Sequence, residues 1–282
     1  MTSLSVITPV LNGSKFIESC ITNVINQRCH KLEHLILDGG STDGTLEIIQ
    51  KYARRHSHIK CFSEKDSGQS QAMNKGIRMA EGEIIGFLNV DDFYDPNLLN
   101  QILDLFEDLP KPAFAVGNCR VWNDEGRLIN INCPRRTGIL EILSQKYPFP
   151  QNPSAYFYHK VIHDKIGLYD EVNHNNYSMD LDFILRTAKY IRFHYFDEVW
   201  GNFVLHSTSK TYMEMEDKSI FLRVQKIFKR HYQKLTLYQK INVFYIRFFG
   251  VLVNEVNDRL RKWYLGKGQE SAEKRIKRFS LM

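Results

Sequence analysis

The sequence predicts an α/β fold with a mostly parallel, doubly wound sheet, followed by a helical C-terminal extension. Short apolar segments alternate with helical patterns four times within the first 100 residues, which is typical of parallel strands joined by helices. Several of these apolar segments end on a carboxylate, and open α/β sheets bind their ligands at the carboxyl ends of the strands. Beyond residue 211 the apolar residues recur at helical spacing among many basic ones.

The strands and helices of the first half follow one another in short order. The first strand is expected from Leu4 to Val10, and Asn12-Gly13 ends it. The second ends on Asp38, before a glycine-rich loop in which Ser41, Thr42 or Asp43 could cap the next helix. The later elements are a strand over residues 59–62, a helix over 71–80 and a strand over 84–88.

The strand over residues 84–88 leads directly into Asn89, Asp91 and Asp92. Two adjacent acids repel each other unless a cation lies between them or one of them faces away. A hard divalent metal would satisfy them, since it prefers oxygen ligands. The plain alternative is an acidic turn before a helix that starts near Pro96, with Asp95 as its N-cap. These residues alone leave both interpretations open.

Composition limits the class of protein. With 282 residues, 43% of them hydrophobic, the chain can bury one substantial core and add a smaller unit. Its five cysteines are odd in number and form no CxxC pair, so we expect free thiols in a reducing compartment. Neither a signal peptide nor an apolar stretch of about 18 residues is visible, so a cytoplasmic location is expected.

Charge is distributed unevenly along the chain. Residues 223–282 hold 15 Lys+Arg and 4 Asp+Glu, a net charge of +11, whereas the preceding 222 residues have a net charge of −5. Such a basic segment suggests an anionic partner, either a membrane surface or nucleic acid. A solvated helical face is the plain alternative.

The second half begins with a predicted β-hairpin, with strands over residues 117–122 and 128–131 around a turn at 123–126. A further strand is expected over 201–205. Neither GxGxxG nor a P-loop motif follows the first strand, which excludes the common dinucleotide and triphosphate folds. Asp38 and residues 89–91 are nevertheless expected to face one crevice, where carboxylates could contact the base and ribose of a nucleotide and hold a metal under its phosphates.

Four segments resemble glycosyltransferase family 2 when taken together in this order: SVITPVLN at 5–12, LDGGSTDGT at 37–45, DSG with AMNKGI over 66–77, and LNVDD at 88–92. The resemblance implies an inverting, nucleotide-sugar-dependent enzyme of GT-A fold, a Rossmann-like sheet with helices on both faces. It implies a GT-A domain over residues 1–211, with a nucleotide-binding half (1–110) and an acceptor half (111–211), before an extension over 212–282. Asn89 departs from the family, where many members have the first Asp of an Asp-x-Asp motif.

The resemblance also implies roles for individual residues. Asp91 and His206 are expected to ligate Mn²⁺ or Mg²⁺, and Asp180 to be the base that deprotonates the acceptor. Asp182, two residues on, is expected to cap the helix or pair with Arg186 at (i, i+4). A helix N-cap remains the plain alternative for Asp180. The residues expected to bind the donor are Thr8, Pro9, Asn12, Asp38, Asp66, Asn74, Asn89, Val90 and Asp91.

The predicted function is transfer of a sugar from a nucleotide-sugar, with a UDP-sugar as the expected donor, to a hydroxyl of a glycan or lipid-linked acceptor in polysaccharide or glycoconjugate synthesis. Residues 151–157 resemble the segment that shapes the acceptor side. One alternative is a metal-dependent nucleotidyltransferase, although residues 3–20 lack a glycine-rich basic loop for a triphosphate. The other is a nucleic-acid-binding protein that uses its basic tail, against which the acidic body argues.

The extension is expected to be amphipathic. Ile220, Phe221, Val224, Ile227 and Phe228 would share one helical face, with Arg223, Lys226, Lys229 and Arg230 on the other. The apolar run over residues 241–253 is too short to span a bilayer and predicts a buried helix, a dimer face or an interfacial segment. A basic cluster at 274–278 ends the chain. The partners expected for this extension are the anionic inner face of a membrane and a second copy of the chain.

Overall fold

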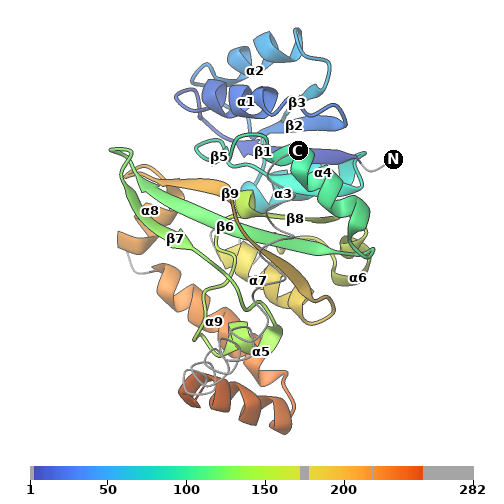
Figure 1. Ribbon diagram of the computed structural model, residues 1–282. Helices are drawn as coiled ribbons and strands as arrows, with labels where there is room; N and C mark the ends of the chain where they lie inside the picture. The colour runs from blue at the N-terminus through green and yellow to red at the C-terminus, as the bar shows by residue number, and fades with distance from the viewer. Residues whose placement is uncertain (1–2, 172–177, 217–218, 250–282) are drawn as a thin grey trace.

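The computed structural model describes residues 3–171, 178–216 and 219–249. Its centre is a sheet of nine strands with helices above and below it, and the C-terminal helices gather at one end (Figure 1). The strands are β1 (Leu4–Val10), β2 (Leu32–Asp38), β3 (Ile59–Ser63), β4 (Ile84–Phe87), β5 (Phe93–Tyr94), β6 (Phe114–Asn123), β7 (Leu128–Asn132), β8 (Tyr156–His159) and β9 (Phe193–Leu205). The helices are α1 (Ile17–Asn26), α2 (Thr45–Ala53), α3 (Gln69–Met79), α4 (Leu98–Asp108), α5 (Ile139–Leu143), the 3₁₀ helix η1 (Pro153–Ala155), α6 (Ile162–Ile166), α7 (Ser178–Ala188), α8 (Lys210–Glu216) and α9 (Ser219–Gln233).

The order of the strands confirms the α/β prediction. β3, β2, β1 and β4 are neighbours and run parallel, as the strand–helix alternation indicates. The second half continues the same sheet: β8 runs antiparallel to β4, and β6 pairs antiparallel with β8 but parallel with β9. β7 returns beside β6 through the predicted hairpin, whose short connection allows only antiparallel pairing.

Helices cover both faces of the sheet because successive side chains of each strand point to opposite faces. On β1, Ile7 packs in the cluster that includes Met73 of α3, whereas Val6 packs with Val24 of α1 on the other face. The carboxyl ends of β1 and β4 are thereby left uncovered by helices. This edge is where the structure forms a cavity.

The N-cap predicted at Asp95 is wrong, whereas the prediction of free cysteines is confirmed. Asp95 is not the N-cap of α4, because the helix starts at Leu98 after Asn97 in a left-handed conformation (φ 60°). The Asp95 carboxylate instead accepts a hydrogen bond from Arg120 at 2.9 Å. The cysteines are free, as expected.

The first helix of the C-terminal extension packs on the body. α9 lies against α7, with Ile227 and Phe228 buried in the main hydrophobic cluster. The predicted two-faced helix is wrong at two positions: Phe221 is exposed, and Arg230 reaches inward to a buried carboxylate of α7. Propensity and periodicity place residues around a helix, but the partner surface decides which side is covered.

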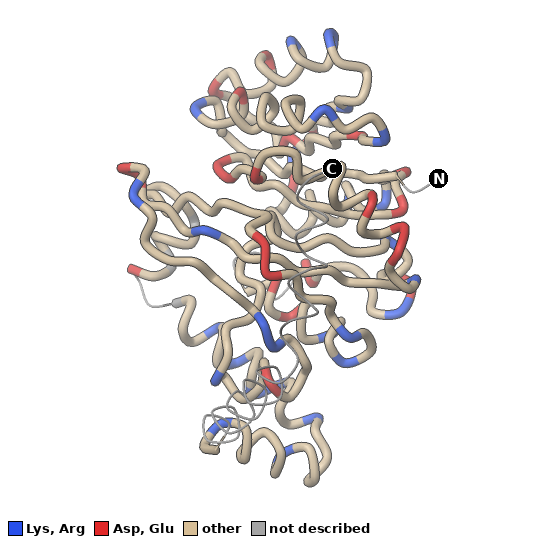
Figure 2. The backbone as a smooth tube through the Cα atoms, in the orientation of Figure 1, with Lys and Arg blue, Asp and Glu red and all other residues tan. Residues whose placement is uncertain are grey.

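A further helical stretch over residues 237–249 follows α9 and is exposed along most of its apolar surface. Val243 is buried, while Leu237, Ile241, Phe244, Tyr245, Phe248 and Phe249 are exposed. Lys and Arg recur along α9 and this stretch (Figure 2). Across the described ranges no helix is long and apolar enough to cross a membrane. The predicted segment 250–253 and the basic cluster 274–278 lie outside the described residues.

Candidate active site

A cavity of about 430 Å³ opens at the carboxyl ends of β1 and β4. Its remaining walls come from the loop before α1, the start of α3, η1, the first turn of α7, the end of β9 and the residues that follow it into α8. The predicted site residues that line it are Pro9, Asn12, Asp66, Asn89, Val90, Asp91, Asp180 and His206. Residues more than 100 positions apart in the sequence therefore meet at one opening, as the resemblance implies.

Three predicted donor-binding residues do not line the cavity. The Thr8 side chain is fully buried, and its hydroxyl lies 2.9 Å from Nε2 of His34. The Asp38 carboxylate is buried too, and it accepts hydrogen bonds from the Ser41 amide and the Ser63 hydroxyl. These contacts satisfy both side chains inside the protein and link β1, β2, β3 and the glycine-rich loop.

Asn74 is the third residue outside the cavity. Its amide exchanges two hydrogen bonds of 2.9 Å with the backbone N–H and C=O of Tyr169, and it also donates to Glu171. The side chain is buried on α3 and all its described bonds point toward the connection before α7. Asn74 therefore clamps this connection.

One wall of the cavity is built from backbone turns held by polar side chains. Asn12 adopts a left-handed conformation (φ 52°), and its side-chain oxygen accepts a hydrogen bond from the Thr42 amide. Asp66 approaches the glycine-rich loop so closely that a Cβ on Gly39 would lie 2.8 Å from its Oδ2. A larger residue directly after β2 would therefore have to displace the Asp66 carboxylate.

Among the predicted site residues, Asp91 and His206 come closest to forming a metal site. The Asp91 Oδ2 lies 3.0 Å from Nε2 of His206, whose Nδ1 is in turn 2.8 Å from the Thr208 hydroxyl. The pair is partly exposed to the cavity. Within the described ranges no group of three or more His, Cys, Asp and Glu side chains forms a metal centre. Two protein ligands suit Mg²⁺ or Mn²⁺, which commonly take their other ligands from phosphates and water.

Asp92 faces away from the cavity. Its carboxylate accepts hydrogen bonds from Asn89 and Asn152 side chains, both at 2.9 Å, and from the Val204 amide at 3.1 Å. Burial raises the pKa of Asp92 well above its usual range, and the charge of Asp91 adds to the rise. The two adjacent acids thus avoid each other by pointing apart, so their adjacency by itself does not require a cation.

Asp180 lies in the first turn of α7 and lines the cavity, although only 7% of its surface is exposed. Its Oδ1 accepts a hydrogen bond of 2.9 Å from the Tyr156 hydroxyl. Burial raises the pKa of Asp180 to about 7, and the Tyr156 hydrogen bond opposes part of that rise. A carboxylate with such a pKa accepts a proton near neutral pH more readily than an exposed one.

Asp182 points to the other side of α7. It accepts a hydrogen bond of 2.9 Å from Arg186, as predicted for the (i, i+4) pair, and it also contacts Arg230 and His231 of α9. Burial alone would raise the pKa of Asp182, but the His231 hydrogen bond and the two arginines hold it well below its usual range. Asp182 is therefore an ionised anchor between helices, remote from the cavity.

Sequence reasoning missed several residues of the cavity. Gln69, which follows the predicted Asp66-Ser67-Gly68 segment, donates a hydrogen bond of 3.1 Å to Oδ1 of Asn89. Thr211 and Met213, from the start of α8, reach the same cavity, and Met213 lies beyond the domain boundary predicted at residue 211. Gln69 could have been found from its place beside a family motif. The positions of Thr211 and Met213 depend on how the chain turns after β9.

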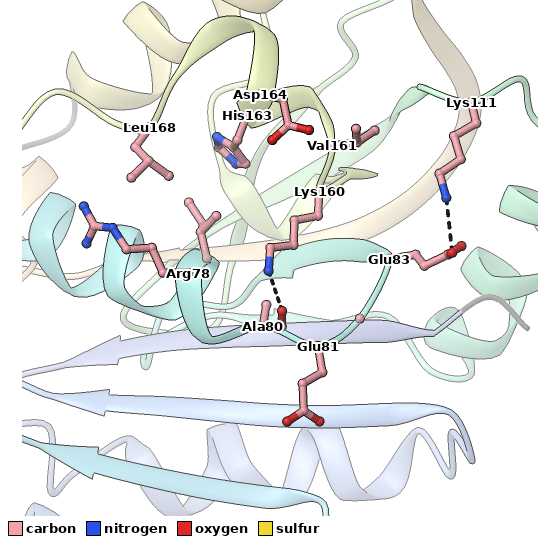
Figure 3. Close-up of a pocket in the computed structure, with 12 residues that line it drawn as sticks. Arg78, Ala80, Glu81, Glu83, Lys111, Lys160, Val161, His163, Asp164 and Leu168 are labelled. Atoms are coloured by element: carbon pink, nitrogen blue, oxygen red, sulfur yellow. Dashed lines mark hydrogen bonds and ion pairs between the residues drawn. The ribbon is translucent and has the colours of Figure 1, made fainter.

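A second cavity, of about 620 Å³, lies near the amino end of β4 (Figure 3). Two of its lysines are engaged with neighbours: Lys160 donates to the Ala80 carbonyl at 2.6 Å, and Lys111 pairs with Glu83 at 3.1 Å. None of the predicted site residues lines it. The first cavity is therefore the candidate active site.

The sequence is similar to those of known glycosyltransferases. The family described as "Glycosyl transferase family 2" matches residues 5–166. The chain is 25% identical to the Escherichia coli K12 protein named "Uncharacterized glycosyltransferase YibD" over 251 residues, which cover 85% of this chain and 71% of that protein. It is 35% identical to a chondroitin synthase of Escherichia coli over 127 residues, 45% of this chain but only 18% of the synthase.

Solved structures share the fold. The crystal structure of S. aureus TarS in complex with UDP-GlcNAc superposes with a TM-score of 0.62 at 18% identity, covering 86% of this chain and 69% of that one. The mannosyltransferase PcManGT from Pyrobaculum calidifontis, in complex with GDP-Man and Mn²⁺, gives a TM-score of 0.53 at 18% identity, over 82% of this chain and 63% of that one. The GT-A fold, the family match and the relatives agree, and the chain belongs to glycosyl transferase family 2, the enzymes that transfer sugars.

Proposed function

We propose that this chain is an inverting glycosyltransferase that moves a sugar from a UDP-sugar to an acceptor hydroxyl in polysaccharide or glycoconjugate synthesis. The single observation that supports it best is the meeting of Asp180 with the Asp91–His206 pair in one cavity of about 430 Å³. A donor needs a site for its diphosphate, and an acceptor needs a base. The cavity offers residue types suited to both.

The donor side is assigned to the wall made by Pro9, Asn12, Asp66 and Val90. Carboxylate and amide groups at this edge can hydrogen-bond with a base and ribose. TarS, a neighbour of the same fold, was crystallised with UDP-GlcNAc, and relatives include a hyaluronan synthase of Pasteurella multocida, 26% identical over 83% of this chain and 24% of the synthase. These names support a UDP-sugar and a polysaccharide acceptor, and a lipid-linked glycan fits the same reaction.

Asp91 and His206 would hold Mn²⁺ or Mg²⁺ with the diphosphate. When bound, the metal would neutralise negative charge on the departing diphosphate. The residues fit such an ion because a carboxylate oxygen and an imidazole nitrogen stand 3.0 Å apart at the cavity wall. Asn89 is held in place by hydrogen bonds with Gln69 and Asp92, which occupy its amide group.

On the acceptor side, Asp180 would take the hydroxyl proton while that oxygen attacks the anomeric carbon. The bond from the anomeric carbon to the diphosphate breaks in the same displacement, which inverts the configuration at that carbon. The proton ends on the Asp180 carboxylate and leaves with solvent after the product departs. One base suffices for this reaction, and within the described ranges Asp180 is the buried carboxylate of the acceptor half that lines the cavity.

We further propose that the helical stretch over residues 237–249 binds an anionic membrane surface from the cytoplasmic side. Its exposed aromatic side chains, among them Phe244 and Phe248, lie beside basic residues such as Lys240 and Arg247. Apolar burial together with attraction to anionic lipid is the usual basis of interfacial binding. A homodimer through this surface is the competing arrangement.

The experiment that tests the catalytic proposal is a donor screen on the purified full-length chain. UDP- and GDP-sugars would be incubated with and without Mn²⁺, and release of the nucleoside diphosphate would be measured. We expect release from a UDP-sugar that rises with the metal and falls to background in Asp180→Asn when an acceptor is present. Transfer of a nucleotidyl group with release of pyrophosphate from a triphosphate would contradict the proposal.

A further inference from the structure

Asp180 stands at the end of a chain of buried hydroxyl groups. Tyr156, on β8, donates a hydrogen bond of 2.9 Å to Oδ1 of Asp180, and the Tyr169 hydroxyl lies 3.4 Å from the Tyr156 hydroxyl. Both tyrosines are almost completely buried. Because the single proton of Tyr156 is committed to Asp180, a hydrogen bond between the two tyrosine hydroxyls runs from Tyr169 to Tyr156, and the Tyr158 hydroxyl is a second acceptor for Tyr169.

The two tyrosine rings are held by their surroundings. Tyr169 stacks on Phe183 of α7 with ring centres 4.5 Å apart, and its backbone N–H and C=O are both hydrogen-bonded to the Asn74 side chain. Tyr156 packs against Phe114 of β6, with centres 5.2 Å apart. Burial raises the pKa of Tyr156 well above its usual range, with the charge of Asp180 adding to the rise, so its hydroxyl remains a donor.

We propose that Tyr156 is a positioning residue of the base, whose hydroxyl holds Oδ1 of Asp180 so that Oδ2 is presented to the acceptor hydroxyl. This inference rests on the proposed role of Asp180. A carboxylate in the first turn of a helix can rotate about its side-chain bonds, and one fixed oxygen removes that freedom. Tyr169 strengthens the arrangement, because a hydroxyl that accepts a hydrogen bond becomes a better donor.

Tyr156 has a second effect besides orientation. Its hydrogen bond stabilises the ionised carboxylate and so lowers the pKa of Asp180 against the effect of burial. In Tyr156→Phe burial remains while the hydrogen bond is lost, so the pKa of Asp180 rises further. Around α7 the titratable and charged groups are Tyr158, Tyr169, Asp182, Arg186, Arg230 and His231. Across the cavity they are Asp66, Asp91 and His206.

The test is the pH profile of kcat for Tyr156→Phe, from about pH 5 to about pH 10, with donor affinity measured separately. We expect the midpoint of the acidic limb to move upward by about one pH unit, as for loss of one hydrogen bond to a charged group. At the alkaline plateau the base is ionised in both proteins, but kcat of the variant should stay below that of the wild type, by up to about 10²-fold, because the carboxylate is no longer held in one orientation. Donor affinity should stay unchanged.

Tyr94→Phe is the matched control. Tyr94 is also buried, but its hydroxyl donates to the Phe87 carbonyl at 2.8 Å and has no contact with Asp180. This variant removes the same atom from the same kind of environment, and its midpoint should equal that of the wild type. If the midpoint of Tyr156→Phe stays at the wild-type value, the Tyr156 hydroxyl does not act on the base and the proposal is overturned.

A second variant guards against failure of Tyr156→Phe to fold. Tyr169→Phe leaves Tyr156 in place but removes its donor, so the midpoint should move in the same direction by a smaller amount. An unmoved midpoint in both variants overturns the positioning role. Asp180→Asn distinguishes this failure from failure of the proposed function: an inactive Asp180→Asn leaves the base assignment standing, whereas a fully active one overturns the base and the positioning role together.

Discussion

Asp180 and Asp182 stand two residues apart on α7, yet one faces the cavity and the other faces α9. Among the residues that the structure describes, Tyr156 is the one that donates a hydrogen bond to Asp180, and burial raises the pKa of Asp180 to about 7. Asp182 is surrounded by Arg186, Arg230 and His231 and remains ionised. One helix therefore supplies a carboxylate suited to exchanging protons and another suited to binding a neighbouring helix.

The first prediction compares the two acids in turnover. Asp180→Asn should keep donor and metal binding but lower kcat by roughly 10²–10⁴-fold, the usual contribution of a general base. Asp182→Asn should have the smaller effect on kcat, because its partners lie outside the cavity. Both variants would be assayed with the same donor and acceptor. An inactive Asp182→Asn beside an active Asp180→Asn would show that the base has been misassigned by two residues.

The second prediction concerns stability and pH. The Asp180 carboxyl keeps its proton up to about pH 7 in the folded chain, against an ordinary value of 3.8, so folding stability falls as the pH rises through this window. Asp180→Asn cannot ionise and should be more stable than the wild type at about pH 8, by on the order of 4 kcal/mol at most. The difference should vanish near pH 4, as measured by urea unfolding.

Asp182→Asn is the matched variant for that measurement. Its pKa is depressed in the folded state, so its ionised form stabilises the fold above the ordinary value and loses this effect only as the pH falls. We expect Asp182→Asn to be less stable at about pH 8 by roughly 1–3 kcal/mol, less than a fully buried pair because Arg186 and Arg230 are partly exposed. Equal signs for the two variants would contradict the assignment of their environments.

The third prediction concerns the metal. Asp91→Ala should abolish the Mn²⁺-dependent part of UDP binding and leave the fold largely intact, since the described hydrogen bond of the carboxylate goes to His206. His206→Ala should weaken the same part of the binding. Calorimetry with UDP, with and without Mn²⁺, provides the measurement. Asp197→Ala, at an exposed carboxylate away from the cavity, is the control, and an Asp91→Ala protein that binds UDP with unchanged metal dependence would remove Asp91 from the site.

The fourth prediction concerns the stretch over residues 237–249. A truncation near residue 218 would also strip α9 from the body and expose Ile227 and Phe228, so point substitutions are the cleaner test. Phe244→Ser with Phe248→Ser should lower sedimentation with anionic vesicles, because two exposed aromatic anchors are lost while each basic residue still contributes up to about 1 kcal/mol.

The control for that experiment replaces apolar residues exposed elsewhere. Leu128→Ser with Ile131→Ser changes two exposed side chains of β7 and should leave vesicle binding as it is. Wild-type protein that sediments equally with neutral and anionic vesicles would count against an electrostatic contribution. A concentration-dependent dimer that is lost in the double Phe variant would favour the competing arrangement.

The sequence predicted the parallel strands and the residues at their ends because both are local properties of the chain. Apolar runs of four to seven residues, each followed by a turn, define β1, β2 and β4, and the side chain of Asp91 needs only its own strand to reach the edge. Asp180 was predicted from the resemblance of its segment to a family motif, which is also a local property of the sequence. These parts of the fold and the site were predictable without long-range contacts.

Other residues could not be placed because distant partners decide their orientation. Asn74 has the residue type of a ligand-binding side chain, yet its hydrogen bonds go to Tyr169, 95 positions later. Thr8 faces His34 on the neighbouring strand, and neither residue reveals which side of β1 the cavity lies on. The sequence pattern places Arg230 on the basic face of α9. Only the packing of that helix on α7 shows that Arg230 contacts the buried Asp182 carboxylate.

The Asp92 carboxyl has a consequence for building chimaeras within this family. It joins the loop after β4 to Asn152, 60 positions later, and to the backbone of Val204, 112 positions later. An exchanged acceptor half must therefore bring both of these partners in the same register, or the transplanted segment leaves a buried acid without its donors. The hydrogen bonds of Asp92 are therefore a condition that a grafted acceptor half must meet to pack on its new host.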